Sequence, residues 1–127
     1  MTRFLPPLLA FLFASSVGLW AQTPDDIVAE VAEELDEDGR LDDAAEEGLA
    51  EMRALAAAPL NINAATESDL GKLLFLNSVK IHALLAHRRA VGQFHTLQEL
   101  MTVRSLSRSD VLRLGHFISF AENSENA

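Results

Sequence analysis

Apolar residues recur every three or four positions along most of the chain after residue 26, which is the spacing of one face of an α-helix. Ile27, Val31 and Leu35 form a first set that stops at Asp38-Gly39. A second set follows, made of Leu41, Ala45, Leu49, Met52 and Leu55. The pattern predicts two amphipathic helices joined by a turn between residues 22 and 58.

The first of these helices has a clear start signal. Thr23 supplies a capping hydroxyl, Pro24 stands where no amide donor is needed, and Asp25 and Asp26 place carboxylates at the positive end of the helix dipole. We therefore expect the helix to begin at Pro24.

From Pro59 onward the pattern repeats, and residues 66–87 align with residues 96–117 at an offset of thirty without a gap. Each copy opens with a threonine followed three residues later by an acid, Thr66 with Asp69 and Thr96 with Glu99. That spacing is typical of a capping box. Each copy is thus predicted to be a short helix, a tight hairpin and a longer helix.

The repeat also predicts a core. Leu76 and Leu106 are expected to tuck beneath the two hairpins, and Gly92 should end the first copy. The apolar residues on either side of the hairpins should face a shared interior: Leu70, Leu73, Ile81, Leu84, Leu100, Val103, Val111 and Leu114. Phe94 and Phe117 fall on the same apolar period and are expected in the core rather than as platforms for nucleobases.

The first 21 residues resemble a secretory signal peptide, because Arg3 leads into an apolar run that ends before Gln22. An uncleaved anchor is the alternative, but Pro6, Pro7, Ser15 and Ser16 interrupt the run. The segment also falls short of the roughly 20 apolar residues of a spanning helix. Export to the periplasm or the extracellular space is the expectation.

The net charge of −9 is divided unevenly along the chain. Residues 22–58 carry 13 acidic side chains against Arg40 and Arg53, whereas residues 59–120 carry seven Lys and Arg against four Asp and Glu. An acidic segment is therefore joined to a mildly basic one, and residues 121–127 form an acidic tail that we expect to be disordered.

No metal, cofactor or small-molecule substrate is predicted. The chain has no cysteine, which excludes a disulfide framework, a thiol nucleophile and Cys-ligated zinc. Glu34, Asp36, Asp38 and Gly39 imitate the start of an EF-hand loop, but position twelve is Ala45, so a solvated acidic turn is favoured over a calcium site.

The histidines have no metal-ligand spacing, and they could instead add partial positive charge to this half of the chain. They are His82, His87, His95 and His116. No nucleophile elbow, phosphate-binding loop or paired-carboxylate arrangement is found on the repeat, so an enzyme is not expected.

The stretch PLNINAATESDL, the repeat that follows it and the HRRAVGQF junction between its copies resemble the tandem helix-hairpin-helix domain of the ComEA-like competence proteins. The resemblance covers residues 59–120. It implies an all-α fold: a five-helix tandem module with a short connecting helix or turn, preceded here by the acidic helical hairpin. It also implies that hairpin amides and the following helix N-terminus hold a DNA phosphate, which is a sequence-independent contact.

The chain departs from this family at the hairpins. Phe75 and Asn77 replace the two glycines of the first hairpin, and Ser105 and Ser107 replace those of the second. Asn77 can adopt a left-handed conformation and Ser107 can cap the next helix. Phe75 can do neither, so its ring is expected to obstruct a phosphate or to pack against another surface.

The resemblance and the charges together give the predicted DNA-binding residues. They comprise hairpin amides, two cations that follow the hairpins and three supporting arginines: Asn77, Ser78, Ser107, Lys80, Arg108, Arg88, Arg89 and Arg104. An ordinary solvated face is the alternative interpretation of these cations, because a net charge of +3 is modest for a DNA-binding domain.

Two functions are predicted from these patterns. The first, which the resemblance implies, is weak, sequence-independent binding of double-stranded DNA outside the cytoplasm, as in DNA capture or uptake. The second is a degenerate helix-hairpin-helix module that binds an envelope protein through Phe75 and the acidic helices. In either case the acidic segment is expected to be able to fold back over the basic face and mask it.

Overall fold

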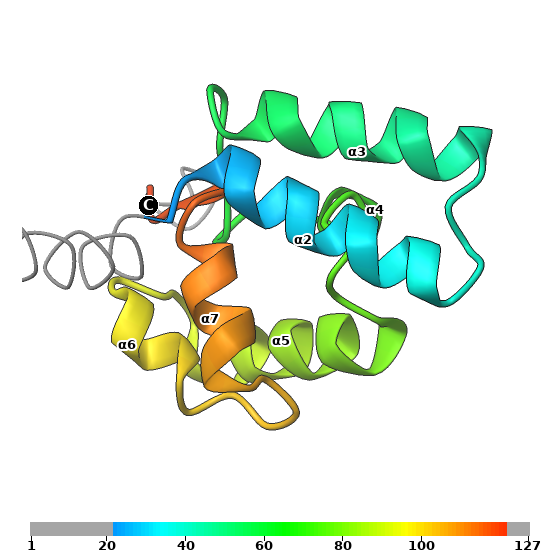
Figure 1. The fold of residues 1–127 in the computed structure, drawn as a ribbon. Helices are drawn as coiled ribbons and strands as arrows, with labels where there is room; N and C mark the ends of the chain where they lie inside the picture. Colours follow the sequence, from blue (N-terminus) through cyan, green and yellow to red (C-terminus); the bar gives the residue numbers. More distant parts are fainter. Residues whose placement is uncertain (1–21, 122–127) are drawn as a thin grey trace, which may run out of the picture.

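The computed structural model describes residues 22–121, drawn in colour in Figure 1. The predicted signal peptide and residues 122–127 of the predicted tail lie outside the described residues. No helix within residues 22–121 is both long enough and apolar enough to cross a bilayer. The regular structure of the described chain is helical, apart from two paired strands of two residues each. The all-α class is therefore confirmed.

The acidic segment forms the two predicted helices, α2 (Pro24–Glu37) and α3 (Asp43–Leu55). Thr23 Oγ1 accepts a hydrogen bond from the Asp26 amide, and the Asp26 carboxylate accepts one from the Thr23 amide, which confirms the predicted start. Gly39 turns the chain with a φ of +70°. The two helices lie side by side along one edge of the molecule (Figure 1).

The two copies of the repeat each form the predicted pair of helices around a hairpin. The first consists of α4 (Glu67–Leu70) and α5 (Ser78–Val91), and the second of α6 (Leu97–Leu100) and α7 (Arg108–Leu114). The sequence predicted either a short helix or a turn between the two copies, and the structure has no helix between α5 and α6. The described module therefore has four helices and not the expected five. Gly92 ends α5 with a φ of +97°, a conformation that sends the chain away from the helix axis.

The capping boxes differ between the copies. In the first, Thr66 and Asp69 satisfy each other's amides as predicted. In the second, the Thr96 side chain accepts a hydrogen bond from the Glu99 amide. The Glu99 carboxylate, however, accepts its hydrogen bond from the His95 amide at 2.9 Å and not from the Thr96 amide. The longer Glu side chain reaches one residue further back, so only half of the predicted second box forms.

One hydrophobic core joins the acidic helices to the repeat. Ile27, Val31 and Met52 from the acidic pair are at most 1% exposed, and Phe94 and Phe117 from the repeat are fully buried. The eight apolar residues that flank the hairpins are buried as predicted. Leu76 is buried beneath its hairpin, whereas Leu106 is half-buried.

The ends of the repeat are held together by β1 (Leu60–Asn61) and β2 (Ile118–Ser119), which pair in parallel. Beside them, buried Asn63 donates through Nδ2 to the carbonyls of Phe94 and Ala121 at 3.0 and 2.9 Å, and its Oδ1 accepts from the Phe94 amide at 2.7 Å. Asn63 thereby fixes the link between the two copies against the start and end of the module.

Candidate nucleic-acid interface

The two hairpins meet through a pair of equivalent residues. Lys80 and Asp110 stand thirty positions apart, each in the first turn of the longer helix of its copy. Lys80 Nζ lies 2.8 Å from Asp110 Oδ2, and the Asp110 side chain is 7% exposed. The repeat therefore forms a pseudo-twofold arrangement with an ion pair where its two longer helices begin.

Asp110 also holds the second hairpin. Its carboxylate accepts from the Ser107 amide at 2.9 Å, while Ser107 Oγ accepts from the Asp110 amide at 3.1 Å. Burial by itself would raise the pKa of Asp110, but the hydrogen bonds from Lys80 and Ser107 outweigh it and lower the pKa below its ordinary value. The carboxylate stays charged and keeps both donors occupied.

Two of the predicted phosphate ligands are therefore already bound within the chain. The Lys80 ammonium and the Ser107 amide both donate to Asp110 rather than standing open to an external anion. The prediction that Ser107 caps the following helix is confirmed.

The first hairpin turns without glycine and without a left-handed residue. Asn77 has a φ of −88° and accepts from the Lys80 amide through Oδ1 at 2.9 Å, so it caps α5 in an extended conformation. The left-handed conformation considered for Asn77 is therefore not adopted. The amides of Asn77 and Ser78 have no hydrogen-bond partner within residues 22–121.

The second hairpin keeps the left-handed conformation. Ser105 has a φ of +75° and is the one described residue other than glycine with a positive φ. Phe75, which occupies the same place in the first hairpin, does not share it. The two hairpins therefore turn differently, the first without a left-handed residue and the second with a strained serine.

The Phe75 side chain packs inside the molecule. Its ring centroid lies 6.2 Å from that of Phe117, and the guanidinium carbon of Arg113 lies 5.8 Å from the Phe75 ring centroid. Of the two outcomes expected for this ring, it packs against another surface of its own chain. Phe75 is half-buried, so part of its ring remains exposed.

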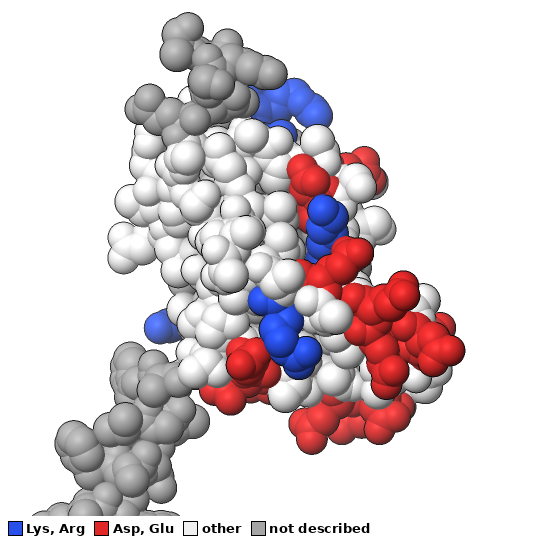
Figure 2. All heavy atoms as spheres, turned by 90° about the horizontal axis from the view of Figure 1, so that it is seen from above, with Lys and Arg blue, Asp and Glu red and all other residues white. Residues whose placement is uncertain are grey.

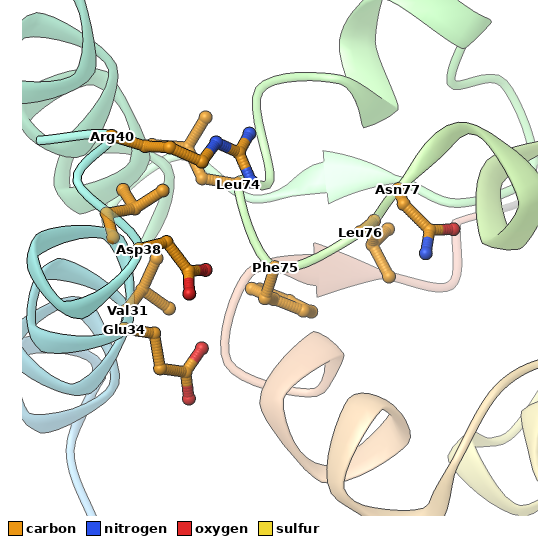
Figure 3. Close-up of a pocket in the computed structure, with 9 residues that line it drawn as sticks. Val31, Glu34, Asp38, Arg40, Leu74, Phe75, Leu76 and Asn77 are labelled. Atoms are coloured by element: carbon orange, nitrogen blue, oxygen red, sulfur yellow. The ribbon is translucent and has the colours of Figure 1, made fainter.

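A small pocket of about 200 Å³ separates the first hairpin from α2. Glu34 and Asp38 point into it from the acidic side, facing Phe75 (Figure 3). Arg40 also lines this pocket, and Glu34 is paired with Arg113, so a phosphate that approached from this direction would meet charges of both signs.

Helix α2 also neutralises one cation of the repeat. Arg113 Nη2 lies 2.8 Å from Glu34 Oε1 and 3.1 Å from Glu30 Oε2, and the Arg113 side chain is 14% exposed. The hydrogen bond that Arg113 donates to Glu34 is the main reason that the pKa of Arg113 is raised, although burial opposes it. The acidic segment therefore covers the basic half at Arg113.

Arg88, one of the predicted binding residues, forms structural contacts within the chain. Its Nη1 donates to the carbonyls of Ile62 and Ala65 at 3.0 and 2.7 Å, which ties α5 to the start of the repeat. Burial, and then the neighbouring charge of Arg89, lower the pKa of Arg88.

Three of the predicted cations remain open: Arg89, Arg104 and Arg108 are exposed and have no ion pair or hydrogen bond within the described chain. Arg104 and Arg108 flank Ser105 and Ser107 in the second hairpin, whose tip lies on the far side of the molecule from α3 (Figure 1). In Figure 2, the acidic side chains gather toward the end where α2 and α3 are joined. The unpaired cations beside a hairpin are therefore those of the second hairpin, whereas the hairpin amides without a partner within residues 22–121 are those of Asn77 and Ser78 in the first.

The roles of Asp110 and Arg113 were not predicted from the sequence. The spacing of Ser107 and Asp110 is that of a capping box and could have been recognised. The equivalence of Lys80 and Asp110 in the repeat was also visible. The link from Arg113 to Glu30 spans 83 residues and has no local signal.

Within residues 22–121 no group of three His, Cys, Asp or Glu side chains could hold a metal ion. The His82 ring is 2.9 Å from the Glu67 carboxylate, and the His87 ring stacks on Phe94 with 5.7 Å between centroids.

The repeat half of the chain has a match among known protein families. Residues 56–119 match the family model described as helix-hairpin-helix motif. This stretch begins just before the predicted module and ends within β2. A search of the curated proteins found no match.

Proposed function

Because this chain belongs to the helix-hairpin-helix family, whose motif is commonly nucleic-acid binding, we propose that it binds double-stranded DNA without sequence preference. The observation that supports this function is the pair of exposed arginines beside the second hairpin. Arg104 and Arg108 flank its tip and have no partner within the described residues, so they can contact phosphates.

Binding is weak and involves mainly one hairpin. On the side of the first hairpin, the cation Lys80 is bound to Asp110, and the neighbouring pocket is lined by Glu34 and Asp38 as well as by Arg40. Two or three phosphate contacts correspond to a slope of roughly −2 to −3 for log affinity against log salt concentration. The same slope provides the test.

The test uses fluorescence anisotropy of a short labelled duplex titrated with residues 22–127 across a salt series. Replacing Arg104 and Arg108 with alanine should reduce the slope by about two, since two phosphate contacts are lost. Lys72→Ala is the control, because it removes one exposed positive charge from the first copy. An unchanged slope in the double variant would move the interface away from the second hairpin, and no binding at low salt would reject the function.

The cellular role belongs to the same proposal. An apolar N-terminal segment led by Arg3 and the ComEA-like stretches support an exported protein that captures DNA in the cell envelope. Expression in a host with a secretion pathway should yield a periplasmic product whose mass lacks about 21 residues. A full-length product that remains in the cytoplasm would contradict export.

A further inference from the structure

The pseudo-twofold repeat places two equivalent surfaces on the module, one beside each hairpin. Each surface takes two residues from a hairpin and two from the other copy. We call them the first platform, made of Leu74, Phe75, Arg113 and Phe117, and the second platform, made of Arg104, Ser105, Ala83 and His87. These residues correspond one to one at the offset of thirty.

The first platform is occupied by the acidic helical pair of the same chain. Arg113 binds Glu30 and Glu34 of α2, and Val31 lines the small pocket with Phe75. Gly48 of α3 packs against Leu74 so closely that a Cβ there would lie 3.2 Å from the Leu74 side chain. The chain itself therefore shows what this kind of surface binds, namely an acidic amphipathic helix.

The second platform is open. Its four residues line a hollow of about 420 Å³ together with Val79 and Ala86, and Val79 is 63% exposed. Ser105 is too small to fill the space that Phe75 fills in the first copy. The His87 ring lines one side of the hollow and is held in place because it stacks on the buried Phe94.

The charge of the second platform fits the same class of ligand. Arg104 lines the hollow and has no ion pair within residues 22–121. The two acidic residues of the second copy are already engaged, Asp110 with Lys80 and Glu99 with the His95 amide. An apolar hollow beside an unpaired arginine is complementary to an amphipathic helix that carries carboxylates.

We propose that the second platform is a docking site for an acidic amphipathic helix of a partner protein. Small apolar side chains of that helix lie over Val79, Ala83 and Ala86, and a carboxylate pairs with Arg104. The site is separate from the proposed DNA function but shares Arg104 with it, so helix and DNA compete for this surface.

The probe is a labelled, helix-stabilised peptide with the sequence of residues 24–37, which is α2 itself. The intact chain keeps its own α2 on the first platform at a high effective concentration, so a peptide added in trans reports on the second platform. Binding is measured by anisotropy at low salt, and amide chemical shifts at Val79, Ala83 and Ala86 identify the location.

Two variants test the site, and a third is the control. Arg104→Glu and Ala86→Glu should each weaken peptide binding roughly fivefold or more, because each sets a carboxylate against an acidic ligand. Ala50→Glu makes the same substitution as Ala86→Glu on an exposed position of α3 and should leave binding unchanged. Circular dichroism shows that each variant is folded.

Absence of peptide binding up to millimolar concentration overturns the inference, and so does binding that neither platform variant weakens. If duplex DNA binds through Arg104 and the peptide does not, the surface belongs to DNA alone and the docking site is rejected. If the peptide binds and DNA does not, the docking site stands and the proposed DNA function fails.

Discussion

At the scale of single residues, the four positions that lack glycine have different fates. Phe75 packs against Phe117 and Arg113, Asn77 and Ser107 cap helices, and Ser105 alone keeps a positive φ. Substituting glycine at these four positions would therefore change packing and stability to different extents. In particular, Phe75→Gly would remove a packed ring and would not by itself restore a phosphate site.

Ser105→Gly should stabilise the protein by up to about 1 kcal/mol. It relieves a left-handed conformation that costs an L-residue roughly 1–2 kcal/mol, and the added freedom of glycine in the unfolded chain offsets part of the gain. Ser107→Gly is the matched variant in the same hairpin, where φ is −81°. It removes a capping hydroxyl and should not stabilise the protein. Urea denaturation measures both, and equal effects would contradict the assignment of strain to Ser105.

Asp110→Asn should destabilise the protein by about 1–3 kcal/mol near neutral pH, since it leaves the partly buried Lys80 without its partner. The folded-state pKa of Asp110 is depressed below its ordinary value. Its contribution is therefore complete above the unfolded pKa and is lost as the pH falls through the folded pKa. The variant should have a shallower loss of stability below about pH 4.

Asp69→Asn is the control for this prediction. Asp69 caps α4 and also has a lowered pKa, but it is less buried than Asp110 and forms no ion pair with a lysine in the described chain. Chemical denaturation between about pH 3 and pH 7 compares the two variants. Equal losses at neutral pH would show that the pair with Lys80 contributes nothing beyond the cap.

At the scale of elements, one face of α2 packs in the core and the other face carries carboxylates that repel anions. Ile27, Val28 and Val31 are buried in the common core, while Glu30 and Glu34 bind Arg113. The contact is built into the packed structure, so the masking of the repeat is a fixed property of this helix and is limited to the side of the first hairpin.

Changing Glu30 and Glu34 to glutamine should raise DNA affinity several-fold at low salt, because the charge of Arg113 becomes available to an external anion. Stability should fall by about 1–3 kcal/mol, since the largely buried Arg113 loses both of its charged partners. Changing Glu33 and Glu37 to glutamine removes two charges from the same helix at exposed positions without a partner within residues 22–121. If both double variants raise affinity equally, net charge and not the Arg113 contact is responsible.

At the scale of the whole molecule, the acidic pair and the repeat share one core. Met52 and Ile62 lie on opposite sides of the change in composition near Pro59, and both are fully buried in the same cluster. A contrast of charge along the sequence therefore does not divide the molecule into two independent cores.

Removing residues 22–58 should leave residues 59–121 largely unfolded or greatly destabilised, because buried apolar side chains of the shared core become exposed to water and full burial of one such side chain contributes about 1.5–3 kcal/mol. Circular dichroism and thermal unfolding of the two proteins measure this. A cooperative transition of the shortened protein at an unchanged temperature would show that the repeat is stable alone. DNA binding is accordingly tested on the longer protein.

The sequence by itself determined the repeat, the helices on either side of each hairpin, the Thr23 and Thr66 caps and most of the core residues, because helical period, Thr-x-x-Asp spacing and glycine at a helix end are local signals read along the chain. Only the tertiary structure decided which charges are available. The sequence does not distinguish the bound cations, Lys80, Arg88 and Arg113, from the open ones, Arg89, Arg104 and Arg108. Each bound cation contacts a group between 23 and 83 residues away along the chain. Electrostatic partners depend on distance in space, which a pattern of residues does not record.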